Sequence, residues 1–141
     1  MNLPFKEVVL DGGTIIELLL LGQDSSIYKN ILNEEIIPIA TILAIIEAEY
    51  ILCKKLGKDK SFEKVDNLVN SNYIVIEPLE HFYREISILK CNVPIALADC
   101  ATIALATNYN VPALFARREA ELKKPIREKA FKIEIFFVKD L

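Results

Sequence analysis

Residues 7–20, EVVLDGGTIIELLL, place the tightest constraint on how this 141-residue chain folds. Three consecutive apolar residues at 8–10 run into turn residues, which is typical of a short strand buried on both faces of a parallel sheet. Asp11 falls at the carboxyl end of that strand, where Gly12 and Gly13 are expected to let the chain turn. Ligands of open α/β sheets bind beyond the carboxyl ends of the strands. Asp11 is therefore either a helix N-cap or the first oxygen ligand of a metal site.

Strand-like and helix-like segments alternate along the rest of the chain. We expect strands at residues 7–10, 73–76, 110–115 and 132–138. Residues 35–39 could form another strand, in which Pro38 suits an edge position or a strand end. Helical patterns occupy residues 14–21, 27–33, 41–56, a segment from 61, 79–89, 96–108 and 117–124, the last halted by Pro125. Strands separated by helices predict one three-layer α/β/α domain over residues 1–141, with a mainly parallel central sheet.

Composition excludes several classes of protein. The apolar fraction of 52% and the charged fraction of 26% are those of an ordered globular chain. The formal net charge of −3 gives no whole-molecule attraction for nucleic acid, so RNA or DNA binding requires a local basic face. The longest apolar run, residues 36–46, is about half a membrane span, and no secretory signal is expected. The cysteines, Cys53, Cys91 and Cys100, lack CxxC spacing and are expected to be buried thiols in the reducing cytoplasm.

Three acidic residues stand where solvent-facing charge is not expected. Asp11 ends the first strand, Glu47 lies within ILAIIEA and Asp99 lies within IALADCA. An ionised carboxylate in an apolar setting is costly unless it is paired, and few basic residues lie nearby in sequence. A hard divalent metal would satisfy several carboxylates at once. The alternatives are that Asp11 caps a helix starting at Thr14, that Asp99 caps one starting at Ala101, and that Glu47 is an exposed helix position.

The segments VVLDGGTIIELLL, ILAIIEAEYIL, VPIALADCATIALATNYNVPALF and ARREAEL, in this order, resemble the PIN-domain nucleases. They are most similar to the VapC-type toxins of prokaryotic toxin–antitoxin pairs, and they cover most of the chain. The resemblance implies that Asp11, Glu47 and Asp99 are the three core acids of the site. It implies Glu119 as the fourth acid, with Glu121 as the alternative.

The same resemblance implies a metal-dependent endoribonuclease, in which these acids hold Mg²⁺ or Mn²⁺ and hydrolyse RNA. It also implies a cognate antitoxin protein as partner, a homodimer and a cytoplasmic location. A catalytically inactive PIN-like binding or scaffold module is the alternative function. A phosphatase-like or receiver-like protein ranks last, because Phe115 is not followed by the lysine that such a site needs. His81 is expected to be a surface or packing residue rather than a catalyst.

Two departures from the family pattern bear on substrate binding. Gly13 stands where the family often carries a hydroxyl, and Thr14 follows it. Arg117 and Arg118 precede the fourth acid, where a hydroxyl and a small residue are common, and they begin a basic run that extends to Lys129. These arginines either weaken activity or contact substrate phosphate. Thr14, Arg117 and Arg118 are the predicted substrate-binding residues.

Overall fold

The computed structural model describes residues 2–141 and contains one five-stranded sheet in which every strand is parallel to its neighbours. The strands are β1 (Glu7–Leu10), β2 (Ile37–Thr41), β3 (Val75–Glu77), β4 (Ala113–Phe115) and β5 (Ile135–Phe137). Their order across the sheet is β3-β2-β1-β4-β5. This order puts β1, the strand that carries Asp11 at its end, in the middle of the sheet. The predicted parallel α/β architecture is confirmed.

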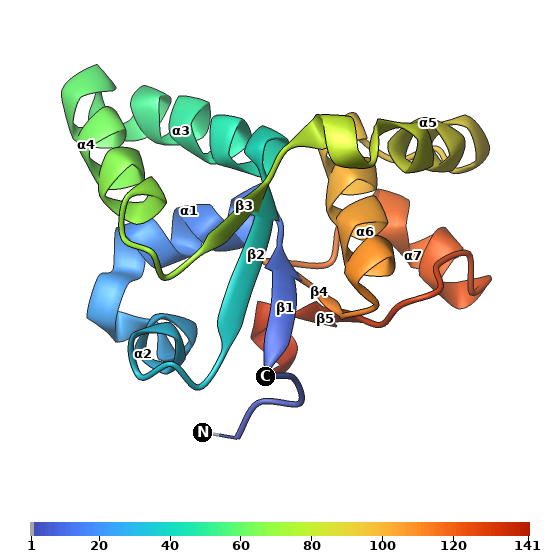
Figure 1. Ribbon diagram of the computed structural model, residues 1–141, viewed down its shortest axis with the longest axis horizontal. Coiled ribbons are helices and arrows are strands. Elements are labelled where there is room, and N and C mark those ends of the chain that lie inside the picture. Colours follow the sequence, from blue (N-terminus) through green and yellow to red (C-terminus); the bar gives the residue numbers. More distant parts are fainter. Residues whose placement is uncertain (1) are drawn as a thin grey trace.

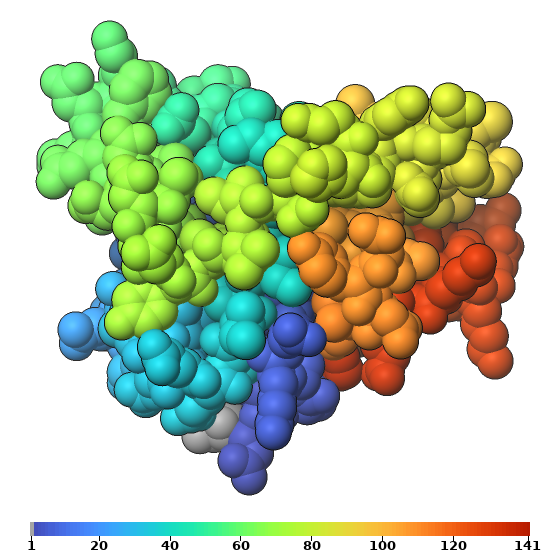
Figure 2. Space-filling model, in the orientation of Figure 1, coloured from blue at the N-terminus to red at the C-terminus, as the bar shows by residue number. Residues whose placement is uncertain are grey.

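Within residues 2–141, seven α-helices cover the sheet. They are α1 (Gly12–Leu21), α2 (Ser26–Leu32), α3 (Ile42–Leu56), α4 (Lys58–Val69), α5 (Tyr83–Asn92), α6 (Leu97–Tyr109) and α7 (Ala120–Arg127). Short 3₁₀ turns lie at Gly22–Asp24, Leu79–His81 and Val138–Asp140. Helices α1 to α4 lie on one side of the sheet and α5 to α7 on the other, which makes three layers (Figure 1). Figure 2 shows the same division, with blue to green atoms gathered on the left and yellow to red atoms on the right. None of these helices is both long and apolar enough to cross a lipid bilayer.

Strand β1 is buried on both faces, as its apolar run predicts. Val8 and Leu10 belong to the core on the side of α1 to α4, and Val9 belongs to the core on the side of α5 and α6. All three side chains are fully buried. Successive strand residues point to opposite faces, so the two cores meet only through the sheet. The carboxyl end of β1 is therefore held rigidly from both sides.

Helix α6 buries a long run of mostly small side chains. Its residues from Asp99 to Ala106 are all buried, and they include Ala101, Ala104 and Cys100. The helix contacts β1, β2 and β4 as well as α3 and α5. Small residues let a helix backbone approach a sheet closely. This contact fixes the first turn of α6, which carries Asp99, next to the carboxyl ends of the strands.

The segment at residues 35–39, for which a strand is one possibility, contributes to strand β2 from Ile37 onward. It lies between β1 and β3, so the expectation of an edge position for Pro38 is wrong. Pro38 pairs with Val8 of β1, whereas β3 pairs with β2 only from Ile39 onward. The missing amide of Pro38 therefore interrupts no hydrogen bond to β3. Pro38 is the second residue of β2, so the alternative that it lies near a strand end agrees with the structure.

The expectation that Pro125 halts the last helix is also wrong, because α7 continues through Pro125 to Arg127. Proline lacks an amide, so the helix loses one hydrogen bond, to the carbonyl of Glu121 in the first turn. The Pro125 side chain is buried together with that of Leu122. Packing of the ring against the core offsets the lost hydrogen bond.

The expectation of three buried thiols holds only in part. Cys100 in α6 is buried, Cys53 is partly buried and Cys91 is exposed, and all three are free. Ile86 is the buried residue of helix α5, and most other side chains of this helix, including that of Cys91, face outward. The apolar context of Cys91 in the sequence did not reveal that α5 is covered on one side only.

Leu105→Ala is expected to lower the free energy of unfolding by about 3 kcal/mol, because the side chain is fully buried in α6 and its removal leaves a cavity. Leu21→Ala is the matched control, since Leu21 is 50% exposed at the end of α1 and the same truncation should cost less than about 1 kcal/mol. Urea unfolding of both variants measures the difference. Equal losses would contradict the assignment of Leu105 to the core.

Candidate metal centre

Five carboxylates gather at the carboxyl edge of the sheet. We call them the acidic cluster, and its members are Asp11, Glu47, Asp99, Glu119 and Glu121. They come from four places in the chain: the end of β1, the second turn of α3, the first turn of α6 and the segment after β4. In Figure 1 this edge lies at the top of the sheet, where β2 runs into α3 and the upper end of α6 lies opposite. The parallel arrangement brings these ends together because all strands point the same way.

Asp11 caps helix α1 and remains available for a second contact. Its Oδ1 accepts a hydrogen bond of 2.8 Å from the Thr14 amide, as an N-cap does. Burial raises the pKa of Asp11 to about 6, against the opposing effect of hydrogen bonds from Thr14, and the charge of Glu47 raises it further. A carboxylate has two oxygens, so the cap and the ligand interpretations of Asp11 do not exclude each other.

Gly12 makes room for Glu47. A Cβ at residue 12 would overlap Oε1 of Glu47 and lie 2.9 Å from its Cδ. The chain turns from β1 into α1 at Gly12 and Gly13, as expected, but neither glycine has a positive φ. Gly12 is required instead because the Glu47 carboxyl approaches the α1 backbone closely. The pKa of Glu47 is raised by burial and by the charge of Glu119.

Asp99 lies inside α6 and does not cap it, so the capping alternative for this residue is wrong. The N-cap of α6 is Ala96, three residues earlier. The Asp99 side chain is buried, at 7% exposure. Burial raises the pKa of Asp99 to about 8, and a hydrogen bond with Glu121 and the charges of neighbouring acids contribute. The fold therefore holds the Asp99 carboxyl where its ionised form is destabilised by burial and by neighbouring negative charge.

Both candidates for the fourth acid reach Asp99. Carboxylate oxygens of Asp99, Glu119 and Glu121 lie within 4.8 Å of one another. Oε1 of Glu121 also accepts a hydrogen bond of 3.4 Å from the Ala96 amide. Residues two apart point away from each other within a helix. Here Glu119 has an extended backbone before α7 and Glu121 is in the first helical turn, so both side chains turn to the same site.

No basic side chain within residues 2–141 forms a salt bridge with the acidic cluster. The pKa of Glu119 is raised by burial and by Glu121, and the charge of Arg117 lowers it only in part. Buried carboxylates that repel one another and lack a cation are unfavourable. Oxygen donors in this number fit a hard divalent metal ion such as Mg²⁺ or Mn²⁺.

The predicted substrate-binding residues are found in three different environments. Thr14 is 1% exposed, and its hydroxyl donates a hydrogen bond of 3.1 Å to the carbonyl of Leu114. Arg117 is exposed beside the acidic cluster. Arg118 turns toward the C-terminus, where its Nη2 lies 2.9 Å from Oδ2 of Asp140. Substrate contact stays a prediction for all three residues.

His81 lies apart from the acidic cluster, as expected for a surface residue. Its side chain is 59% exposed, and Nδ1 lies 2.8 Å from Oε1 of Glu77. Tyr109 donates a hydrogen bond of 2.8 Å to the other oxygen of Glu77. These contacts tie the end of β3 to α6, which is a structural role.

Comparison with known proteins agrees with this geometry. The chain shares its fold with the crystal structure of FitAcB from Neisseria gonorrhoeae, with a TM-score of 0.56 and 18% sequence identity. That alignment covers 95% of this chain and 99% of the other. Among curated proteins no match was found. The family model for the PIN domain matches residues 8–124, a range that includes the whole acidic cluster. The chain therefore belongs to the PIN domain family.

Proposed function

We propose that this protein is a divalent-metal-dependent endoribonuclease that acts as the toxin of a type II toxin–antitoxin system. One observation carries the proposal: a PIN domain here holds five carboxylates at one edge of its sheet, with no salt-bridge partner among the described residues. The membership of the PIN domain family supports nuclease chemistry. The carboxylate donors support a metal ion as the missing cation.

Asp11, Glu47, Asp99 and Glu119 would hold one or two Mg²⁺ or Mn²⁺ ions, and Glu121 would assist them. A bound ion would supply charge neutralisation at the phosphate and activation of a water molecule. The protein side chains hold the ligand positions. The Thr14 amide fixes Asp11, and the absence of a side chain at Gly12 leaves Glu47 free to enter the site.

Protons are part of this proposed mechanism. In the absence of metal, Asp99 and Glu121 are close enough to share a proton, which relieves their repulsion. That proton has to leave before both carboxylates can act as ligands. Arg117 is exposed next to Glu119 and is suited to attract the RNA phosphate toward the site.

We further propose a cognate antitoxin, a homodimer and a cytoplasmic location. Helix α3 supports the homodimer, because it presents Ile42, Ile46 and Tyr50 at 38%, 54% and 50% exposure. These residues are spaced by four and therefore form one apolar stripe along the helix. Such a stripe is suited to protein contact rather than to water.

Asp99→Asn is expected to weaken Mn²⁺ or Mg²⁺ binding by at least about tenfold and to abolish RNA cleavage, because it removes a charged oxygen ligand. Calorimetry and a gel-based cleavage assay measure the two effects. Asp24→Asn is the control, since Asp24 is an exposed acid in the turn after α1. A folded wild type that binds metal but leaves RNA intact would support the alternative of an inactive binding module. No metal binding at all would contradict the metal centre.

Metal affinity is expected to rise with pH between about 6 and 8.5, by up to about tenfold per pH unit for each proton displaced. The reason is that the raised pKa values of Asp11, about 6, and Asp99, about 8, leave protons in the free site. Over the same range the metal-free protein should lose stability as pH rises, because the folded state holds protons that the unfolded state has released. Calorimetric titrations and thermal melts across this range test both trends. Flat profiles would contradict them.

Gly12→Ala is expected to reduce metal affinity and cleavage by about tenfold or more while the protein stays folded, because the new methyl group displaces the Glu47 carboxyl. Gly13→Ala is the comparison variant. Its Cβ would lie 3.1 Å from the Cβ of Ala116 and 3.4 Å from Oδ2 of Asp11, an ordinary van der Waals contact, so it overlaps no carboxylate of the acidic cluster. Calorimetry distinguishes the two variants. Unchanged binding in Gly12→Ala would rule out Glu47 as a ligand.

A further inference from the structure

A groove adjoins the acidic cluster on the side of α7. It has a volume of about 250 Å³ and lies between α7 and the end of β5. Leu122 and Phe137 provide apolar walls, and Arg118, Lys123 and Arg127 provide positive charge. Glu119 lines the groove and is also a member of the acidic cluster. The groove therefore continues directly from the candidate metal centre.

The charges along α7 form a regular row. Lys123 and Arg127 are spaced by four residues within α7, which places them on one face of the helix, and Glu119 lies just before the first helical residue. Each step of four residues advances about 6 Å along a helix axis. Successive phosphates of an extended nucleic acid strand are separated by a comparable distance. The row begins at the acidic cluster and leads away from it along the groove.

The cations of the groove differ in whether a carboxylate already pairs with them. Arg118 pairs with Asp140 at 2.9 Å, and its guanidinium lies 4.8 Å from the centre of the Phe137 ring. Within the described part of the chain, Lys123 and Arg127 form no salt bridge, and both are exposed. Lys124 faces elsewhere and lies 3.8 Å from Glu128. Lys123 and Arg127 are therefore the cations available to an anionic ligand.

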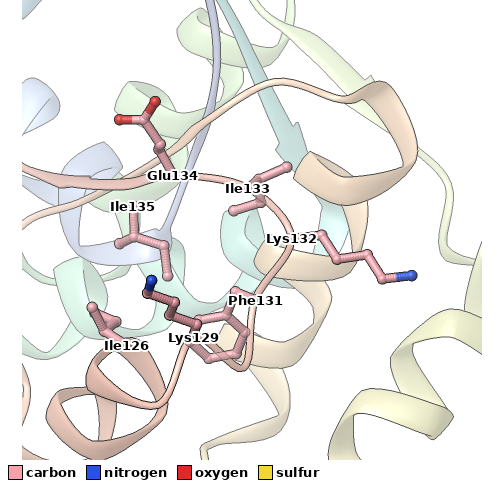
Figure 3. Close-up of a pocket in the computed structure, with 7 residues that line it drawn as sticks. All are labelled: Ile126, Lys129, Phe131, Lys132, Ile133, Glu134 and Ile135. Atoms are coloured by element: carbon pink, nitrogen blue, oxygen red, sulfur yellow. The ribbon is translucent and has the colours of Figure 1, made fainter.

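A second hollow on the same side of the sheet has a different character. Figure 3 shows it lined by apolar side chains, among them Phe131 and Ile133, together with Lys129 and Glu134. It lies at the amino end of β5, the opposite end of the strand from the acidic cluster. Lys132 points away from its centre. Neither Lys129 nor Lys132 lines the groove beside α7.

We propose that the α7 groove binds the backbone of single-stranded RNA on one side of the bond to be cut, with Lys123 and Arg127 contacting successive phosphates. This inference rests on the proposed ribonuclease function and adds a substrate subsite to it. The basic row supplies the local attraction that a chain of net charge −3 requires. Arg118 has a smaller share, because Asp140 already neutralises it.

The test compares two double variants of the full chain that remove the same charge. Lys123→Gln with Arg127→Gln removes the two groove cations, and Lys124→Gln with Lys132→Gln removes two cations outside it. Binding of a fluorescein-labelled 12-nucleotide oligouridylate is measured by anisotropy in EDTA, from low to moderate salt. The groove variant should bind about tenfold or more weakly at 0.1 M salt, and its slope of log K against log salt should be shallower by about 1.4. The control variant should keep the wild-type slope.

Separate readouts distinguish failure of this inference from failure of the proposed function. Equal salt slopes in the two double variants, or no RNA binding by the wild type, would overturn the groove assignment. Cleavage of RNA in Mn²⁺ by the wild type tests the ribonuclease function independently of either result. If the groove is right, the groove variant should raise KM for RNA more than it lowers kcat, and its Mn²⁺ affinity should match the wild type.

Discussion

Repulsion among carboxylates at one edge of the sheet is the interaction on which the rest of the structure depends. Asp11 and Asp99 are 6% and 7% exposed, and burial raises their pKa values to about 6 and about 8. An arrangement of this kind opposes folding unless protons or a cation compensate it. The double core around β1 and the close packing of α6 hold the acids in place despite that cost. Such a cost to stability is common at sites that bind ligands, which supports the proposed metal centre.

The sequence predicted the fold, and it marked the acids that the fold brings together, because both leave local patterns. A three-residue apolar run followed by Asp11 indicates a buried strand with an acid at its end, and this is what the structure has. Glu47 and Asp99 are recognisable in the sequence because each is an acidic residue within an otherwise apolar segment with a helical pattern. Parallel strands then bring such residues to one edge without further information. Burial and periodicity therefore marked these three acids as candidates, and the resemblance to the PIN-domain nucleases favoured the site interpretation over the capping one.

Other features depend on contacts between distant parts of the chain, which periodicity does not encode. Gly12 is required by Glu47, a residue of another helix, and not by its own backbone angles. Arg118 donates a hydrogen bond to Asp140, which lies twenty-two residues later in the sequence. Glu121 joins Glu119 at the site only because the helix begins between them. In each case the local pattern allowed several outcomes, and tertiary packing selected one.

The acidic cluster limits from two sides how far away the surrounding positive charges can lie. Under the proposed function, cations that touched the carboxylates would replace the metal, whereas cations too far away would not offset the repulsion of RNA. Lys123 lies in the first turn of α7, and Arg127 follows it by about 6 Å of helix rise. Across residues 2–141, neither cation forms a salt bridge with the acidic cluster, so both remain available to the proposed substrate. The Arg118–Asp140 pair, meanwhile, keeps the nearest flexible cation of the groove away from Glu119. One short helix would thus separate the proposed metal binding from the proposed attraction of substrate.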